Sequence, residues 1–234
     1  MSRRFEPPGL PRQRRGTTPG MVGRYPDFDV LEEADHWDEL TRRVVLERVE
    51  RTPELRFFDA REAAALDALC DYVTGQVGEE PKIPVLAFVD EKLHEGKLDG
   101  YRYFDMPDDR ETWRIVARGL DEEARRRGAE SFALLSERDQ DDVIHRFSKA
   151  ELFGGAWAAL TVSRAWSVVV RQICEQFYSH PWAWNEIGFG GPAYPRGYAR
   201  FGSPHLRNGE TESWEGREAF ELDPVRDVQE RRLD

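Results

Sequence analysis

The chain has 234 residues, of which 34% are charged and 12% aromatic, and its formal net charge is −11. This length suffices for one sizeable hydrophobic core, and the aromatic side chains supply apolar surface that disordered chains lack. The negative charge excludes nucleic acid and anionic membrane surfaces as favoured partners, because both would repel the chain.

The N-terminal segment differs in composition from the rest of the chain. Residues 1–24 are rich in proline, glycine and arginine, which is typical of disorder. We interpret them as a disordered basic tail, with a phosphate-binding arm as the alternative. No apolar stretch of the kind that completes a twin-arginine export signal follows Arg3 and Arg4, and no stretch is long enough to span a membrane. We therefore expect a cytoplasmic protein with no membrane insertion, and export on a signal-bearing partner stays open.

Helical periodicity dominates the middle of the chain. Apolar residues recur at intervals of three and four, whereas the alternation typical of strands is nearly absent. The pattern predicts an all-α fold, an irregular bundle of about five main helices preceded by a short one. The predicted helices cover about residues 38–50, 59–75, 84–96, 110–127, a segment opened by Ser136, and 155–178.

Several helix ends carry recognisable capping residues. Asp59 and Glu62 fit a capping box, in which the side chain of each residue accepts a hydrogen bond from the backbone N–H of the other. Gly75 is expected to end that helix, Pro84 to stand in the first turn of the next, and Gly96 to end it.

The periodicity breaks after Tyr178. Residues 177–202 combine bulky aromatic side chains with glycine and proline, which argues against a regular helix or strand. We predict an extended aromatic arm there, an acidic tail over residues 203–234, and a single helical domain over residues 25–202.

No self-contained catalytic, cofactor or metal site is predicted. Glu91 with His94, and Asp142 with His145, resemble parts of a di-iron signature, but their helical positions point away from the apolar faces. We read these pairs as solvated charged faces. The chain has no Gly-x-Ser-x-Gly elbow, and residues 188–191 do not follow a strand as a phosphate-binding turn would.

Two cysteines, Cys70 and Cys174, lie far apart in predicted helices. We expect both to be core thiols rather than a disulfide, a metal pair or a nucleophile.

The aromatic arm is then the strongest candidate for function. One interpretation is that it caps the chain's own core, and the other is that it docks on a partner, because aromatic residues and arginine are enriched in interfaces. We expect Phe177, Ile187 and Phe189 to pack on the bundle. His180 is read either as a structural histidine or as a contact. The predicted partner interface consists of Tyr178, His180, Trp182, Trp184, Tyr194, Arg196 and Tyr198.

Three sequence stretches resemble the gluconate 2-dehydrogenase subunit 3 family. They are Phe57-Phe-Asp-x-Arg-Glu-Ala-x-x-Leu-x-x-Leu, Pro84-Val-Leu-Ala-Phe-Val-Asp, and the signature Phe177-Tyr-Ser-His-Pro…Ile187-Gly-Phe-Gly-Gly-Pro192…Gly197-Tyr198. The resemblance covers about residues 55–202. It implies a non-catalytic small subunit that binds and stabilises, or helps to mature, a large oxidoreductase of the glucose-methanol-choline type.

The same resemblance implies that FAD is bound by the partner and not by this chain. The large subunit would oxidise a sugar, sugar acid or polyol and pass electrons to a cytochrome or another acceptor. Family members often begin with a twin-arginine signal, and from residues 1–24 we expect none here. Two alternatives remain, a transient chaperone or adaptor for that flavoprotein and a stand-alone metal-dependent bundle enzyme.

Overall fold

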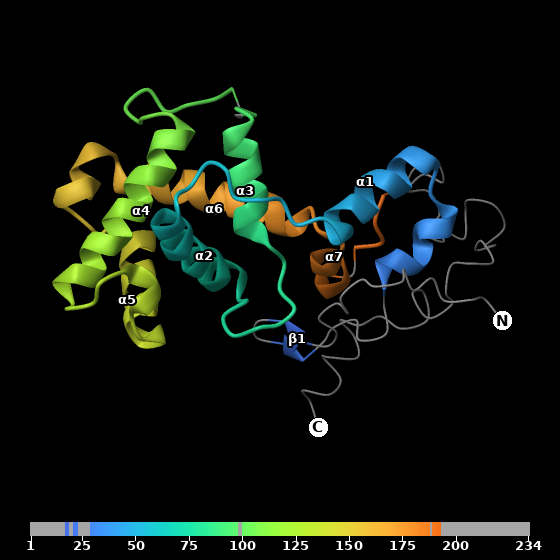
Figure 1. Cartoon of the computed structure of the whole chain (residues 1–234), viewed down its shortest axis with the longest axis horizontal. Coiled ribbons are helices and arrows are strands. Elements are labelled where there is room, and N and C mark those ends of the chain that lie inside the picture. The colour runs from blue at the N-terminus through green and yellow to red at the C-terminus, as the bar shows by residue number, and fades with distance from the viewer. Residues whose placement is uncertain (1–16, 19–20, 23–28, 98–99, 188, 193–234) are drawn as a thin grey trace, which may run out of the picture. The chain divides into compact units, whose positions relative to one another are not determined.

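The computed structural model describes residues 17–18, 21–22, 29–97, 100–187 and 189–192 (Figure 1). These residues form seven α-helices, three short 3-10 helices and one pair of two-residue strands. The predicted all-α fold is confirmed. The described residues cluster into two compact units, one over residues 51–180 and the other over the described parts of 1–50 and 181–234. The predicted single domain over 25–202 spans both.

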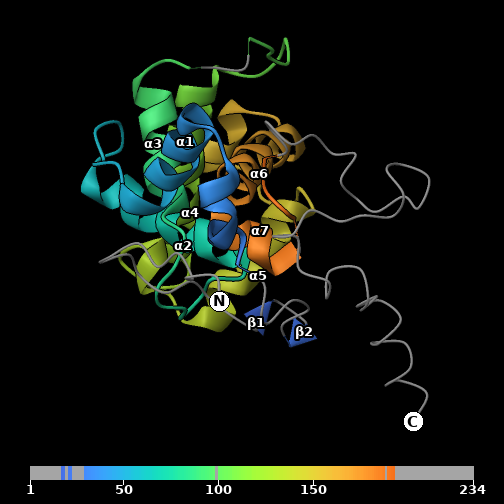
Figure 2. The same ribbon diagram turned by 90° about the vertical axis from the view of Figure 1, so that its right-hand side faces the viewer.

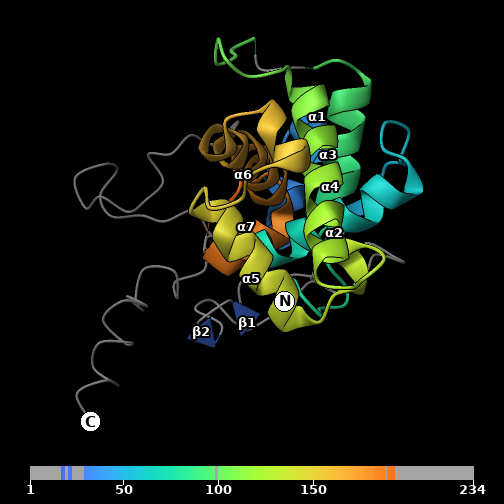
Figure 3. The same ribbon diagram turned by 90° about the vertical axis from the view of Figure 1, so that its left-hand side faces the viewer.

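The first unit contains the bundle. Its elements are α2 (Ala60–Thr74), α3 (Val85–His94), α4 (Asp109–Arg126), η2 (Phe132–Leu134), α5 (Glu137–Ser148), η3 (Gly155–Ala159) and α6 (Val162–Tyr178). Helix α2 contacts α3, α4, α5 and α6 and lies beside α4 in the views of Figure 1 and Figure 3. The largest fully buried side chains of this unit include Trp113, Trp157, Phe132, Phe147 and Leu66.

The second unit joins the two ends of the described chain. It contains η1 (Val30–His36), α1 (Glu39–Glu50) and α7 (Pro181–Ile187), and α7 contacts both η1 and α1 (Figure 2). Its core is formed by Val30, Leu31, Ala34, Trp37 and Val45. Strands β1 (Thr17–Thr18) and β2 (Met21–Val22) pair antiparallel within the segment predicted as a disordered tail.

The predicted helix ends are largely confirmed. The Asp59 side chain accepts the backbone N–H groups of Arg61 and Glu62, and the Glu62 side chain accepts that of Asp59, which completes the capping box. Gly75 ends α2 with φ 67°, a left-handed conformation in which glycine carries no steric penalty. Pro84 occupies the N-cap of α3, one position before its expected place.

Two expectations about helices are wrong. The predicted helix over 155–178 is divided, because Leu160 and Thr161 are in extended conformations with φ values of −151° and −84°, and Gly155–Ala159 form a separate 3-10 helix. The aromatic arm contains a regular helix, α7. Its seven residues have proline only at the first position, where a missing N–H costs no helical hydrogen bond. None of the described helices is both long and apolar enough to cross a bilayer.

Candidate partner interface

Helix α7 holds the segment of residues 29–37, here called the N-terminal strap. The Oδ1 atom of Asn185 accepts the backbone N–H of Val30 at 2.7 Å, and its Nδ2 atom donates to Asp29 at 3.3 Å. The half-buried Trp184 ring packs against the apolar cluster formed by the strap and α1. The beginning of the aromatic arm therefore folds onto its own chain.

Gly191 has a steric role in the same contact. A Cβ atom at this position would lie 2.7 Å from Cγ2 of Val30 and 3.3 Å from Cζ2 of Trp37. Its φ of 77° also disfavours a side chain. Gly191, the last glycine of the Ile-Gly-Phe-Gly-Gly-Pro motif, is thus required by the close approach of the arm to the strap.

The arm's side chains are oriented differently from the sequence-based expectation. Trp182 is only 4% exposed, so its ring is not on the surface, whereas Ile187, expected to pack inward, is 52% exposed. Phe189 is partly exposed and makes an edge contact with Trp184. Phe177 is buried as expected and Tyr178 is about half exposed. The exposed apolar groups of the described arm are Tyr178, Ile187 and Phe189.

His180 occupies a buried position. It is almost fully enclosed, its ring lies 6.5 Å from the ring of Phe88, and its backbone N–H donates to Phe177 at 3.1 Å. This agrees with the structural role that the sequence left as one of two readings. Three residues of the predicted interface, Tyr194, Arg196 and Tyr198, lie outside the described residues, so their place at an interface stays a prediction.

The residues that resemble a di-iron signature are engaged in surface ion pairs. Glu91 accepts two hydrogen bonds from Arg51, at 2.7 and 2.9 Å, which hold the pKa of Glu91 below its ordinary value. Asp142 pairs with Arg127 at 2.7 Å, and His94 and His145 are exposed. Within the described part of the chain, no group of histidine, cysteine, aspartate and glutamate side chains is placed to hold a metal ion.

Both cysteines were expected to be core thiols, and this is confirmed for Cys70 alone. Cys70 is buried and Cys174 is half-buried. Burial raises the pKa of the Cys70 thiol well above its ordinary value and raises that of Cys174 as well. The thiolate is the reactive form of cysteine, so neither environment activates a nucleophile.

A second surface was missed by the sequence analysis. Residues 100–105, here called the aromatic loop, connect α3 to α4 and carry Tyr101, Tyr103 and Phe104. Phe104 is 92% exposed and Tyr101 is also exposed. A ring this exposed adds nothing to core packing, and exposed aromatic groups of this kind mark contact sites.

The aromatic loop is held in place by contacts with the start of α6. Asp105 forms an ion pair with Arg164 and accepts a hydrogen bond from Thr161 at 3.1 Å. The Arg164 guanidinium lies 4.8 Å from the ring centroid of Tyr103 and 5.6 Å from that of Phe104. The exposed rings are therefore presented in a fixed arrangement, which lowers the entropy cost of binding.

A signal for this loop was present in the sequence. Tyr-Arg-Tyr-Phe places three aromatic residues within four positions between two predicted helices. In a helix, apolar side chains recur every three or four residues because one face packs on the core. A loop between helices has no such repeat, so helix packing does not explain three aromatic residues there.

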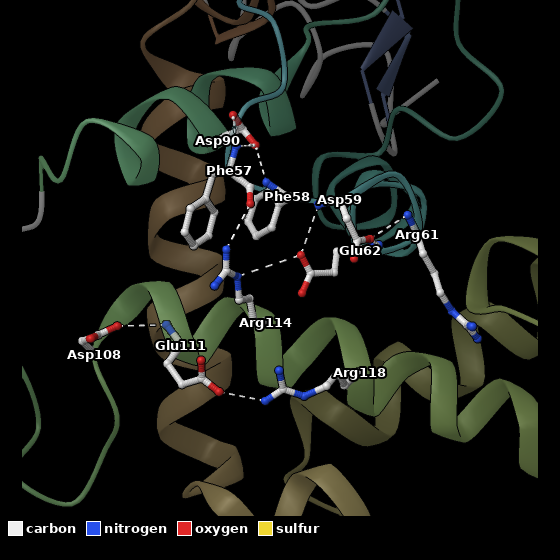
Figure 4. Close-up of polar contacts among 10 residues, drawn as sticks. All are labelled: Phe57, Phe58, Asp59, Arg61, Glu62, Asp90, Asp108, Glu111, Arg114 and Arg118. Carbon is white, nitrogen blue, oxygen red and sulfur yellow. Dashed lines mark hydrogen bonds and ion pairs between the residues drawn. The ribbon is translucent and has the colours of Figure 1, made fainter.

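A buried carboxylate fixes the chain between α1 and α2. Asp90 of α3 is fully buried and accepts the backbone N–H groups of Arg56, Phe57 and Phe58 at 2.7 to 3.1 Å. Figure 4 shows its contacts with Phe57 and Phe58. The carbonyl oxygen of Phe57 in turn accepts a hydrogen bond from Arg114 at 3.2 Å. Asp90 thereby positions the ring of Phe57 beneath the exposed face of α4.

Comparison with known proteins identifies the family. No curated protein and no solved structure matches the chain. Residues 60–191, more than half of the chain, match the pattern of the gluconate 2-dehydrogenase subunit 3 family. This range begins at the first residue of α2 and includes the aromatic loop and α7 with Gly191. The chain therefore belongs to the gluconate 2-dehydrogenase subunit 3 family.

Proposed function

We propose that this chain is the small, non-catalytic subunit of a dehydrogenase complex, bound to a large FAD-dependent oxidoreductase of the glucose-methanol-choline type. The observation that carries the proposal is the family match over residues 60–191. In this proposal the large subunit oxidises a sugar, sugar acid or polyol and passes the electrons to a cytochrome or another acceptor. The small subunit binds and stabilises it.

In this proposal FAD is bound by the partner, as the family resemblance implies, and the described glycines after α7 do not form a dinucleotide-binding turn. Gly190 and Gly191 follow helix α7 rather than a strand, and Gly191 is packed against Val30 and Trp37. A phosphate-binding turn needs its glycines at the end of a strand and the start of a helix. In the partner, the flavin would accept the hydride from the substrate. The residues of this chain would contribute by binding the large subunit.

The aromatic loop supports a role in binding. Phe104 and Tyr101 are exposed on a loop that Asp105 and Arg164 hold in one arrangement. Aromatic side chains and arginine carry much of the binding energy in protein interfaces. We assign this loop to the contact with the large subunit, and we propose the exposed arm residues Tyr178, Ile187 and Phe189 as separate contacts.

The proposal is tested by isolating the tagged chain from its native cells. A subunit should remain bound to a large flavoprotein through gel filtration, with flavin absorption in the same peak. A transient chaperone would release the flavoprotein during that step. Stoichiometric iron or manganese on the isolated chain, with no bound flavoprotein, would contradict the proposal in favour of a metal-dependent enzyme.

The contact surface is tested with a matched pair of variants. Phe104→Ser combined with Tyr101→Ser should weaken binding of the flavoprotein by about tenfold or more, because interface hot spots are commonly aromatic. The control is Leu134→Ser, which removes a side chain that is 69% exposed on η2. Equal affinity of the loop variant and the control would remove the aromatic loop from the interface while leaving the family assignment intact.

A further inference from the structure

Helix α4 is enclosed on almost every side and leaves one narrow row of side chains uncovered. Eleven of its eighteen residues are buried, including the charged Asp121 and Glu123. The side chains that are not buried follow one another at intervals of mainly three and four residues, and they are Arg110, Glu111, Arg114, Arg118, Glu122, Arg125 and Arg126. The exposed line of α4 is therefore rich in arginine, although the chain as a whole carries a net charge of −11.

The first two arginines of the row share one support. The guanidinium groups of Arg114 and Arg110 lie 4.4 and 5.1 Å from the ring centroid of Phe57. Phe57 is itself held by the amide contacts with Asp90 and by the hydrogen bond from Arg114 to its carbonyl oxygen. Stacking on an aromatic ring restricts an arginine side chain without neutralising its charge. Both cations are thus held at defined positions.

The ion pairs of Arg110, Arg114 and Arg118 are weak or absent. No ion pair within the described residues involves Arg110, and Arg114 approaches Glu62 only to 4.0 Å. Arg118 pairs with Glu111 at 2.8 Å, but both side chains are about half exposed, and exposed pairs of this kind contribute little to stability (Figure 4). The positive charge of Arg110, Arg114 and Arg118, here called the arginine row, is available to an incoming carboxylate.

The spacing of the row fits an extended acidic segment. Residues four apart on a helix are separated by about 6 Å along its axis. Alternate residues of an extended chain are separated by about 6.6 Å and lie on one face. Three carboxylates at alternate positions could therefore meet Arg110, Arg114 and Arg118 in turn, and guanidinium groups bind carboxylates through paired hydrogen bonds.

We propose that the arginine row binds an extended acidic segment of the large subunit. This inference rests on the proposed function, since it assumes such a partner. Charge complementarity favours an acidic occupant, and a second copy of this chain is disfavoured because two chains of charge −11 repel each other. The row is a line of separated cations rather than a converging pocket, which suits a chain of carboxylates better than a single small anion.

The test uses the full-length chain and a labelled peptide, (Glu-Thr)6, measured by fluorescence anisotropy at low ionic strength. The variant Arg110→Gln with Arg118→Gln keeps Arg114, which bonds to Phe57, and should bind the peptide about tenfold more weakly. The matched control is Arg43→Gln with Arg138→Gln, two exposed arginines for which no described residue forms an ion pair. It carries the same change of charge and should bind within about twofold of the wild type.

Three results would overturn the inference. They are equal peptide affinity of the row variant and the wild type, an equal loss in the control variant, and equal binding of the neutral peptide (Gln-Thr)6. Circular dichroism checks that all variants keep the helical content of the wild type.

Co-purification separates this inference from the proposed function. If the row variant retains the flavoprotein with unchanged affinity and salt sensitivity, the arginine row is not the contact although the pairing stands. If the wild-type chain recovers no flavoprotein, the proposed function fails, whatever the peptide result.

Discussion

The side-chain amide of Asn185 binds the backbone of Val30, a residue 155 positions earlier in the sequence, at an N–H···O distance of 2.7 Å. Both residues are buried. The same amide group reaches Asp29, the residue whose side chain caps η1. One polar side chain of α7 therefore holds the start of the N-terminal strap.

Replacing Asn185 with leucine should release the strap. The Val30 N–H would lose its acceptor in a buried position, at a cost of about 1–3 kcal/mol. Hydrogen exchange of residues 29–37 should then become faster, while exchange in α2 and α4 stays unchanged. Glu39→Gln, an exposed change in α1, is the control. Unchanged exchange in the strap of the leucine variant would show that apolar packing alone holds it.

Asp90→Asn should destabilise the chain strongly, despite its similar shape. The carboxylate accepts the amide N–H groups of three consecutive residues, whereas an asparagine places a donor NH₂ group against some of them. We expect a loss of about 2–3 kcal/mol in the free energy of unfolding, measured by urea denaturation. The neighbouring change Glu91→Gln, at an exposed ion pair, should cost less than about 1 kcal/mol. Equal losses for the two variants would contradict the role of Asp90.

The Glu91–Arg51 pair should make a small contribution to stability that depends on pH. Hydrogen bonds from Arg51 lower the pKa of Glu91 in the folded chain. As pH falls, Glu91 therefore takes up a proton in the unfolded chain before it does so in the folded chain. The stabilisation by the ion pair is complete above about pH 5 and is lost as pH falls through the folded pKa. The stability difference between wild type and Glu91→Gln should disappear in acid. Arg51→Gln should behave in the same way, and a difference that does not decrease as pH falls would contradict this account.

Gly119→Ala should disturb the contact between α4 and η3. A Cβ atom at residue 119 would lie 2.5 Å from Cε2 and 2.6 Å from Cζ2 of the buried Trp157. Overpacking of this kind costs about 1–3 kcal/mol, measured as a lowered unfolding temperature. The cost should shrink when Trp157→Leu is introduced first, because the smaller side chain leaves room for the methyl group. Equal costs in both backgrounds would show that the strain lies elsewhere.

The helices could be predicted from the sequence because their signals are local. The capping box of Asp59 and Glu62, the Gly75 terminus and the apolar periodicity of α4 and α6 all lie within a few residues of the element they define. The family motifs are also sequence features, and the match over residues 60–191 confirms the family that they indicate. Helix α6 begins at Val162 and not near Gly155, because Leu160 and Thr161 are extended and separate it from the preceding 3-10 turn.

The exposure of individual side chains was decided only by the tertiary structure. Trp182 and Ile187 lie five residues apart in the same helix, yet one is buried and the other exposed, since burial depends on contacts with residues distant in the sequence. The arginine row is visible only when the other faces of α4 are known to be covered. The sequence by itself determined the main bundle helices and the family, because capping and periodicity act over a few residues. Helix α7 and the start of α6 were decided by the structure. Tertiary packing determined which surfaces remain free to bind.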